Sequence, residues 1–209
     1  MNKLLLKIFI WLNNFSYKAI SSLVVRLHNG IHPKHKILKY HNFFATNTST
    51  FDKVLDIGCG NGSVSYDVSK KAKIVVGIDI DKNNVLAAQK KYANTNLRYI
   101  IGDAMIFDFN EQFDIIILSN VLEHIDDRII FLEKIKKIAP KILIRVPLIT
   151  RDWLSIYKKE IEMEYRLDPT HFIEYTEKNF KEEINKAGLK IESYYIKFGE
   201  LYAIVRSSK

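Results

Sequence analysis

The chain opens with a stretch in which apolar residues recur every three or four positions. Over residues 3–27 this spacing predicts a helix with one apolar face, and the charged side chains fall largely elsewhere. Its apolar positions are Leu5, Ile8, Leu12, Phe15, Ala19, Leu23 and Leu27. Asn29-Gly30 and His32-Pro33 are expected to break this helix. A second short helix is predicted over residues 34–44, followed by a polar linker over 46–50.

From residue 53 onward, apolar strand-like runs alternate with helical patterns. This alternation predicts a parallel sheet whose strands are joined by right-handed crossovers. The run Ile115-Ile116-Ile117-Leu118 is apolar throughout, as expected for a strand covered on both faces. The predicted strands are 54–57, 74–80, 97–101, 113–119 and 142–146, and the predicted helices are 64–71, 82–92 and 127–138.

The C-terminal pattern differs from the rest. A helix is predicted over 176–187, ending at Gly188. Strands over 190–197 and 201–206 follow, joined by a tight turn at Phe198-Gly199-Glu200. The predicted fold class is therefore α/β: a Rossmann-like, doubly wound sheet of seven strands, mostly parallel, with a C-terminal antiparallel hairpin and additional N-terminal helices. We expect an N-terminal helical arm over 1–50 and the main domain over 51–209.

Composition and length fit a globular protein. The 209 residues are 47% hydrophobic and 27% charged, which excludes wholesale disorder. The single cysteine excludes an intrachain disulfide and favours a reducing compartment. No run reaches the roughly 18 apolar residues of a spanning helix. Because Lys7 interrupts the first apolar run and no small-residue cleavage site follows, we expect this segment to be retained.

The charge is concentrated at the start of the chain. The net charge is +8, and residues 1–51 contain seven Lys or Arg but no Asp or Glu, which leaves the remainder close to neutral. A basic arm suits an anionic partner such as a phosphorylated substrate, a membrane surface or a nucleic acid, and a solvated basic face is the alternative. Trp11 and the lysines of residues 3–27 would suit a membrane interface, although packing on the domain or on a second subunit is favoured.

The strongest chemical signal is the segment from Val54 to Gly62. A predicted buried strand runs into a loop with glycine at every second position, and glycine lets the backbone bend sharply and approach a ligand. A dinucleotide-binding loop would need its third glycine at the position of Ser63. The Asp56 carboxylate would also disfavour a pyrophosphate, whereas it suits a cationic amino-acid ligand.

This segment resembles the first motif, D-x-G-x-G-x-G, of the class I S-adenosylmethionine-dependent methyltransferases. Three further motifs follow in the family's order and together extend the resemblance over about residues 50–206: Gly77-Ile78-Asp79, Gly102-Asp103-Ala104, and Phe113-Asp114-Ile115 through Ser119-Asn120-Val121-Leu122-Glu123-His124. The resemblance implies that Asp79 binds the ribose hydroxyls, that Asp103 meets the adenine amino group, and that the residues after the fourth strand flank the methionine part of S-adenosylmethionine.

The resemblance implies one pocket for this cofactor and for its product S-adenosylhomocysteine. The cofactor-binding candidates are Asp56, Gly58, Cys59, Gly60, Gly62, Asp79, Ile80, Asp103, Ala104, Asn120, Val121 and His124. Purely structural roles are the alternatives: a helix cap for Asp79, a turn for Asp103, and a small packed residue for Cys59.

The acceptor side is expected in the long connection over residues 147–175, since inserts at this place cover the acceptor in the family. Methyl transfer requires a positioned acceptor, and an alcohol or phenol also needs a base. Residues 168–176 resemble a stretch of small-molecule methyltransferases in which a histidine precedes the last helix. His171 is therefore the candidate general base, and a histidine that fixes the insert by a hydrogen bond is the alternative. Arg145 and Tyr175 are weaker candidates for substrate contact.

A second wall of the acceptor pocket is predicted from the N-terminal arm. Tyr40 and His41 are its substrate-binding candidates, next to the segment His32-Pro33-Lys34-His35. These histidines have no matching cysteine or carboxylate spacing, so no metal site is expected.

The expected function is methyl transfer from S-adenosylmethionine to a small-molecule acceptor. An oxygen of an acidic or phosphorylated metabolite or of a surface-polysaccharide precursor is preferred, and a quinone precursor is the alternative if the N-terminal helix meets a membrane. A nucleic-acid substrate would use the basic arm. It is disfavoured because Ser119-Asn120-Val121-Leu122 replaces the N-P-P-Y type of motif and no recognition domain is appended. A non-catalytic partner subunit is the third reading. We expect a cytoplasmic monomer or homodimer, with peripheral membrane contact through residues 1–27 left open.

Overall fold

The computed structural model describes residues 2–28 and 32–207, which fall into two compact units, Met1–Tyr40 and His41–Lys209. The first unit contains α1 (Asn2–Leu27) and α2 (Lys34–Leu38). The predicted N-terminal helix is thus present, while Asn29-Gly30 lies outside the described residues. Within the described chain, no helix has the length and apolar character needed to cross a membrane.

The prediction of one continuous helix over 34–44 was wrong. Lys39 takes a left-handed conformation, with φ of 52°, and ends α2; α3 (Tyr40–Thr46) begins at the next residue. In α3, the Phe43 ring packs edge-on against Tyr195 and Tyr202 of the sheet, and Phe44 is fully buried. These contacts attach most of α3, which sequence analysis assigned to the arm, to the second unit.

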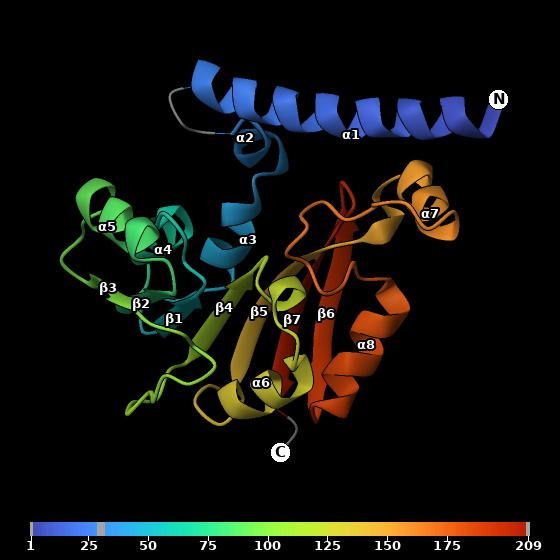
Figure 1. Cartoon of the computed structure of the whole chain (residues 1–209). Helices are drawn as coiled ribbons and strands as arrows, with labels where there is room; N and C mark the ends of the chain where they lie inside the picture. The colour runs from blue at the N-terminus through green and yellow to red at the C-terminus, as the bar shows by residue number, and fades with distance from the viewer. Residues whose placement is uncertain (1, 29–31, 208–209) are drawn as a thin grey trace. The chain divides into compact units, whose positions relative to one another are not determined.

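The second unit is built on one seven-stranded sheet in the order β3-β2-β1-β4-β5-β7-β6 (Figure 1). The strands are β1 (Lys53–Ile57), β2 (Ile74–Asp79), β3 (Leu97–Ile101), β4 (Ile115–Ser119), β5 (Lys141–Pro147), β6 (Leu189–Lys197) and β7 (Glu200–Ser207). The five strands from β3 to β5 in this order pair in parallel, and β7 pairs antiparallel with both β5 and β6. The predicted fold class is confirmed, including the C-terminal hairpin.

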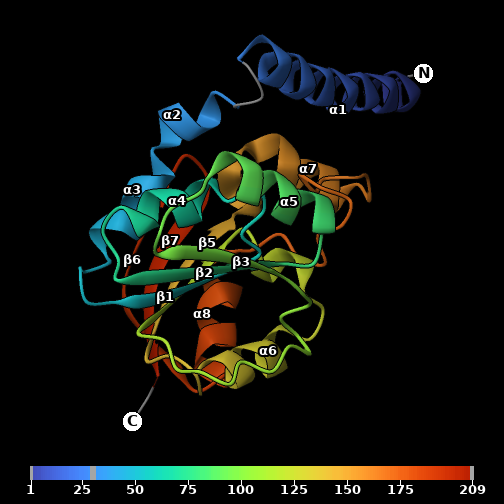
Figure 2. The ribbon, with the colours of Figure 1, turned by 90° about the vertical axis from the view of Figure 1, so that its left-hand side faces the viewer.

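Helices cover both faces of the sheet (Figure 2). On one face lie α4 (Ser63–Ser69) and α5 (Lys82–Lys91), and on the other lie α6 (Arg128–Ile135) and α8 (Glu177–Lys186). Both faces are therefore shielded from solvent, and the central strands β1, β4 and β5 are buried except for Lys53, Ser119 and Lys141 at their ends. Leu55 and Ile57 of β1 join the core cluster that includes Phe131 of α6 and Phe180 of α8. This two-sided burial explains why these strands are mostly apolar.

The turn between β6 and β7 has the conformation that its sequence predicts. Phe198 and Gly199 have φ angles of 51° and 71°, and Lys197 pairs with Glu200 across the turn. Positive φ at both central residues is typical of two-residue hairpin turns. A Cβ on Gly199 would stand 2.4 Å from the Cβ of Arg151, so the turn packs closely on the insert.

The insert over 147–175 contains structure that the sequence pattern did not reveal. It holds a short 3-10 helix, η2 (Ile149–Arg151), and α7 (Trp153–Glu160). Asp152 caps α7 by accepting a hydrogen bond from the Ser155 amide at 2.6 Å. Backbone bonds fix both ends of the insert to each other, because the Ile149 amide donates to the Tyr175 carbonyl at 2.8 Å.

The packing of α3 can be tested by removing one ring. Phe44→Ala is expected to lower the free energy of unfolding by about 3 kcal/mol, because it leaves a cavity in place of a fully buried ring. Phe51→Ala is the matched control, since the Phe51 side chain is 84% exposed, and a change below about 0.5 kcal/mol is expected there. Urea denaturation measures both. Equal effects of the two substitutions would contradict the assignment of α3 to the core.

Candidate functional site

The candidate site lies at the edge of the sheet where the parallel strands end. Because β1, β2, β3 and β4 run in the same direction, the loops that follow them meet at this edge. These loops carry all of the predicted cofactor-binding residues apart from Asp56 and Asp79, which lie on β1 and β2 themselves. The parallel pairing of β1 to β4 thus brings together segments that are far apart in the sequence.

The glycine loop after β1 has an unusual backbone. Gly58, Gly60 and Gly62 have φ angles of 66°, 53° and 81°, a region that favours glycine. A Cβ on Gly58 would stand 2.7 Å from Val121, and one on Gly62 would stand 2.4 Å from the Tyr99 hydroxyl. A Cβ on Gly60 would meet nothing within 4 Å. The two ends of the loop are therefore backed by protein, and its middle is open to a ligand.

Asp79, the last residue of β2, holds the glycine loop in place. Its Oδ2 accepts a hydrogen bond from the Gly60 amide at 2.7 Å, and its Oδ1 accepts from the Asp81 amide at 2.9 Å. The alternative role of Asp79 as a helix cap is wrong, because the cap of α5 is Asp81, whose side chain accepts from the Asn83 amide. Ile80, beside Asp79, has a side chain that is 71% exposed.

Asp56 lies beneath the loop rather than at its open side. Its side chain is buried and its Oδ2 accepts a hydrogen bond from the Ser65 hydroxyl at 2.5 Å. Burial, together with the charge of Asp79, raises the pKa of Asp56 to about 7 despite the Ser65 bond. Burial and the same two carboxylates also raise the pKa of the Cys59 thiol, which remains protonated and packs against Gly77.

The loop after β3 is held by a residue that sequence analysis did not identify. Asp103 makes the turn expected of it, since its Oδ1 accepts from the Met105 amide at 2.8 Å. The ammonium of Lys134 on α6 donates to the carbonyls of Ala104, Met105 and Phe107, at 3.1, 2.8 and 2.8 Å. No sequence signal marks Lys134, because its role requires α6 to face this loop.

The segment after β4 contains two buried side chains with unsatisfied oxygens. Asn120 has φ of 58°, and its side-chain Oδ1 has no hydrogen-bond partner among the described residues. Glu123, in the 3-10 helix η1 (Leu122–His124), is fully buried, and neither of its carboxylate oxygens has a partner in the described part of the chain. Burial raises the pKa of Glu123 to about 7, against the opposing influence of its own backbone amide, His171 and Arg145. Glu123 belongs to the motif that follows the fourth strand, but the sequence did not indicate a role for it.

His171 meets His124 at this place, although 46 residues separate them in the sequence. Their ring centroids are 4.6 Å apart and their planes are nearly perpendicular, at 83°. The Nδ1 of His171 lies 2.9 Å from Glu174 Oε1, so the hydrogen bond proposed as its structural role is present. The Phe172 amide donates to the Glu123 carbonyl at 2.8 Å, which fastens the insert to η1.

Two of the residues predicted to contact substrate, Tyr175 and Arg145, are buried and bind other side chains of the chain. Tyr175 is fully buried and its hydroxyl donates to Glu183 of α8 at 3.1 Å, so the prediction of a substrate contact was wrong. Arg145 is buried and forms an ion pair with Glu200 while donating to the Ser119 hydroxyl at 3.1 Å. This pairing disfavours a direct role in binding substrate.

The described side-chain hydrogen bonds of the two N-terminal candidates are made to residues outside the glycine loop. His41 Nδ1 lies 2.6 Å from Asp67 Oδ2, in the last turn of α4. Tyr40 belongs to the first unit, where its hydroxyl lies 2.6 Å from His35 Nδ1. Their assignment to the acceptor site remains a prediction.

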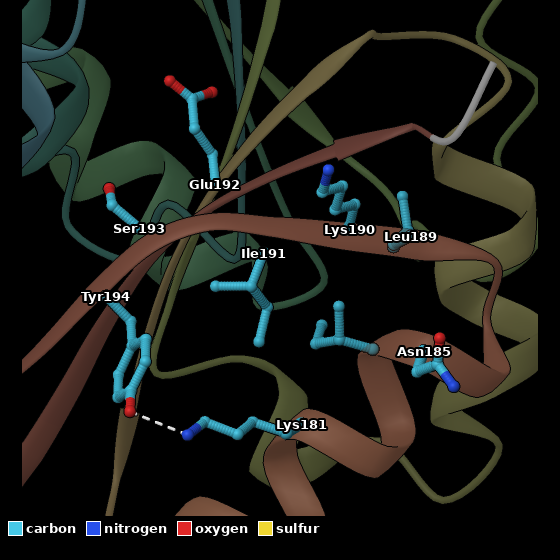
Figure 3. Close-up of a pocket in the computed structure, with 9 residues that line it drawn as sticks. Lys181, Asn185, Leu189, Lys190, Ile191, Glu192, Ser193 and Tyr194 are labelled. Atoms are coloured by element: carbon cyan, nitrogen blue, oxygen red, sulfur yellow. Dashed lines mark hydrogen bonds between the residues drawn. The ribbon is translucent and has the colours of Figure 1, made fainter.

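A separate hollow lies between α8 and the edge strand β6 (Figure 3). Its lining includes Leu189 through Tyr194, and Lys181 closes one side by donating to the Tyr194 hydroxyl at 2.7 Å. Leu189 pairs with Ser207, beside the start of β5, so the hollow lies toward the amino ends of the parallel strands. It is therefore distinct from the glycine-loop edge.

Comparison with known proteins identifies the segment that carries this edge. Residues 55–141 match a family model described as a methyltransferase domain. The ubiquinone biosynthesis O-methyltransferase of Bradyrhizobium diazoefficiens is 31% identical over 118 residues, which cover 55% of this chain and 47% of that protein. The ribosomal RNA small subunit methyltransferase A of Mesomycoplasma hyopneumoniae is 34% identical over 79 residues, which cover 38% of this chain and 30% of that protein. The chain thus spans less than half the length of these relatives.

A solved structure shows the same fold. The N-methyltransferase NodS from Bradyrhizobium japonicum, in complex with S-adenosylhomocysteine, superposes with a TM-score of 0.63 over 84% of this chain and 87% of that one. The two sequences are 14% identical, so the likeness is one of fold.

The buried Asp56 carboxyl predicts a pH-dependent stability. Its pKa of about 7 in the folded chain is higher than the ordinary value of an unfolded aspartate, so the folded chain retains a proton that the unfolded chain loses. This contribution is fully present below about pH 4, is lost at about 1 kcal/mol per pH unit as the pH rises from about 4 to 7, and changes little above pH 7. Asp56→Asn, which keeps the Ser65 bond, should remove this slope. Urea denaturation at pH 5, 6, 7 and 8 gives the comparison, and parallel profiles of wild type and variant would exclude the raised pKa.

Proposed function

We propose that the chain is a class I S-adenosylmethionine-dependent methyltransferase, which binds this cofactor on the glycine loop and methylates an oxygen of a small-molecule acceptor; the match of residues 55–141 to a methyltransferase-domain model supports this. The main support for this proposal is the hydrogen bond that the Gly60 amide donates to the Asp79 carboxylate. The space beside Gly60 is open, so a ligand could occupy it. The loop is thereby preorganised for a ligand, and its opening lies next to a carboxylate.

The polar groups at this edge fit S-adenosylmethionine. Asp79 can accept further hydrogen bonds, as two ribose hydroxyls require. The Asp79 carboxylate suits a ligand with a sulfonium and an ammonium group and would oppose a pyrophosphate; the buried Asp56 adds its charge when it is ionised. The unsatisfied Oδ1 of Asn120 provides a buried acceptor for a ligand N–H. These features support the assignment of Gly58, Cys59 and Gly62 to the cofactor loop and of Ile80, Asp103, Ala104, Val121 and His124 to the surrounding walls.

The chain's own contribution to the reaction is placement and proton handling. S-adenosylmethionine supplies an activated methyl group whose sulfur leaves as a neutral thioether. The protein must hold the acceptor oxygen in line with that bond, which lowers the entropic part of the barrier. His171 is the candidate for handling the acceptor's proton. Its Nδ1 is occupied by Glu174, which leaves Nε2 to act on the acceptor, directly or through a bound ion.

Several observations bear on the acceptor. The similarity to a ubiquinone biosynthesis O-methyltransferase supports an oxygen acceptor, and the basic residues of the first 51 positions support an acidic or phosphorylated one. An RNA substrate draws support from the basic arm and from the similarity to a ribosomal RNA methyltransferase. It is the second candidate because Ser119-Asn120-Val121-Leu122 departs from the N-P-P-Y type of motif. A non-catalytic subunit would require a pocket that does not bind the cofactor.

Titration with S-adenosylhomocysteine tests the cofactor site. Wild-type protein should bind with a Kd in the micromolar range, and Asp79→Ala should weaken binding at least tenfold, because the variant loses both the ribose acceptor and the support of the Gly60 amide. Asp108→Ala is the control, since this aspartate is exposed on the loop after β3. Isothermal titration calorimetry measures all three proteins. Absence of binding to wild type would remove the proposed function and favour a non-catalytic subunit.

We also propose that α1 contacts anionic membranes at their surface. Its exposed apolar residues Leu5, Ile8, Leu12 and Phe15 share one face, while Lys3, Lys7 and Lys18 lie on another and no acidic residue is present. Such a helix suits the interfacial plane of a bilayer.

Co-sedimentation with lipid vesicles tests this contact. Vesicles with one third phosphatidylglycerol should retain the protein, and Lys7→Ala combined with Lys18→Ala should weaken retention more than tenfold, at about 1 kcal/mol per charge. Lys90→Ala combined with Lys91→Ala, on α5, removes the same charge from the second unit and should have little effect. Equal loss in both double variants would show general charge attraction instead of a contact by α1.

A further inference from the structure

We propose that Glu123, His124 and His171 bind a divalent transition-metal ion next to the proposed acceptor site. One ligand atom from each of the three side chains lies within 4.8 Å of the other two. Glu123 and His124 come from η1, directly after β4, and His171 comes from the end of the insert. The fold therefore brings three metal-ligating groups together from two distant segments.

The strongest support is the state of the Glu123 carboxylate. It is fully buried, and neither oxygen has a hydrogen-bond partner among the described residues. Burial of a carboxylate without a partner is costly, and buried charges in proteins are normally paired or coordinate a metal. The buried guanidinium of Arg145 forms its ion pair with Glu200. A cation held between Glu123 and the two imidazoles would supply the missing partner.

The hydrogen bond between His124 Nδ1 and Thr170 leaves Nε2 of His124 available as a metal ligand. The Thr170 hydroxyl donates its proton to Asp168 Oδ1 at 2.7 Å, so toward His124 Nδ1, 2.9 Å away, it must accept. The proton of a neutral His124 therefore sits on Nδ1, and its Nε2 carries a lone pair. Burial and the neighbouring His171 lower the pKa of His124, which is consistent with a neutral ring.

His171 has the same arrangement with a stronger acceptor. Its Nδ1 lies 2.9 Å from the buried carboxylate of Glu174, which Arg151 and the Leu167 amide also hold. An ionised carboxylate can only accept, so Nδ1 of His171 donates and Nε2 is available. A carboxylate behind a histidine is the usual outer support of a metal-ligating imidazole, since it orients the ring and raises its basicity.

Two imidazoles and one carboxylate select the kind of ion. Mg²⁺ and Ca²⁺ prefer oxygen ligands, whereas nitrogen-rich sites suit Zn²⁺, Mn²⁺, Fe²⁺ and Co²⁺. Ligands about 2.1 Å from a tetrahedral ion stand about 3.4 Å from one another, so the side chains would need to close by about 1 Å. Three protein ligands leave a coordination position open for another oxygen.

This site would also define the acceptor, an extension that rests on the proposed function. With the metal bound, Nε2 of His171 would be a ligand and not a base. An acceptor hydroxyl at the open position would instead release its proton to solvent water, because a metal ion lowers the pKa of a coordinated oxygen. The acceptor class is then an alcohol or phenol with an oxygen that can coordinate a metal. No metal site was expected from the sequence, because Glu123 and His124 lie far from His171 along the chain and only the fold brings them together.

Metal titration of the full-length, untagged protein tests the site. Zn²⁺ should bind with one equivalent in calorimetry, and Co²⁺ should produce visible absorption bands typical of a nitrogen-ligated ion. Glu123→Gln preserves the shape of the side chain and should abolish both signals, as should His171→Asn. Glu174→Gln, which removes the outer support, should weaken binding about 10- to 100-fold. His35→Asn is the matched control, because it removes an imidazole from the first unit and should leave both signals unchanged.

Binding of S-adenosylhomocysteine distinguishes failure of the metal site from failure of the proposed function. Retained binding in Glu123→Gln shows that the variant is folded, so the loss of the metal signals is then specific to the site. Absence of a Zn²⁺ or Co²⁺ signal in wild type, or an undiminished signal in Glu123→Gln, overturns the metal site and leaves the two histidines as a packed pair. If wild type binds the metal with these variant effects but not S-adenosylhomocysteine, the metal site stands and the proposed function fails.

Discussion

The candidate site depends on one hydrogen bond, that between the Gly60 amide and the carboxylate of Asp79. Three residues with positive φ would leave the loop after β1 free to adopt many conformations, and this bond joins its middle to the end of β2. The Gly58 and Cys59 amides add a second fastening by donating to the Ile78 carbonyl, at 2.8 and 3.1 Å. The loop is consequently a rigid part of the sheet edge, and the adjacent segments are arranged around it.

The second half of the site is organised by the insert. The Phe172 amide holds the Glu123 carbonyl, and the Thr170 hydroxyl holds the His124 ring. The wall that follows β4 and the segment that precedes α8 are thus coupled through two hydrogen bonds. A change in the position of His171 must therefore involve the residues that flank the proposed cofactor.

The sequence predicted the fold and the cofactor edge well because both depend on local patterns. Uninterrupted apolar runs mark strands covered on both faces, and the alternating glycines mark a loop that few other sequences can form. The fold class was confirmed, and residues 55–141 match a family model of a methyltransferase domain. The predictions were weaker where distant segments meet. Tyr175 looks like a pocket residue in the sequence, yet α8 buries it, and the roles of Lys134 and Glu123 appear only when α6 and the insert are in place. The helix predicted over 34–44 is interrupted at Lys39, which adopts a left-handed conformation. Because this residue is not a glycine, nothing in the sequence indicated the interruption.

The two buried carboxyls of raised pKa also give this protein a buffering capacity near neutrality. Burial raises the pKa of both Asp56 and Glu123 to about 7, so both carboxyls can exchange a proton with the solvent near neutral pH. A cationic ligand at this edge favours their ionised forms and displaces these protons into the solvent. Ligand binding is thereby coupled to proton release, and the heat that accompanies it must depend on the ionisation enthalpy of the buffer.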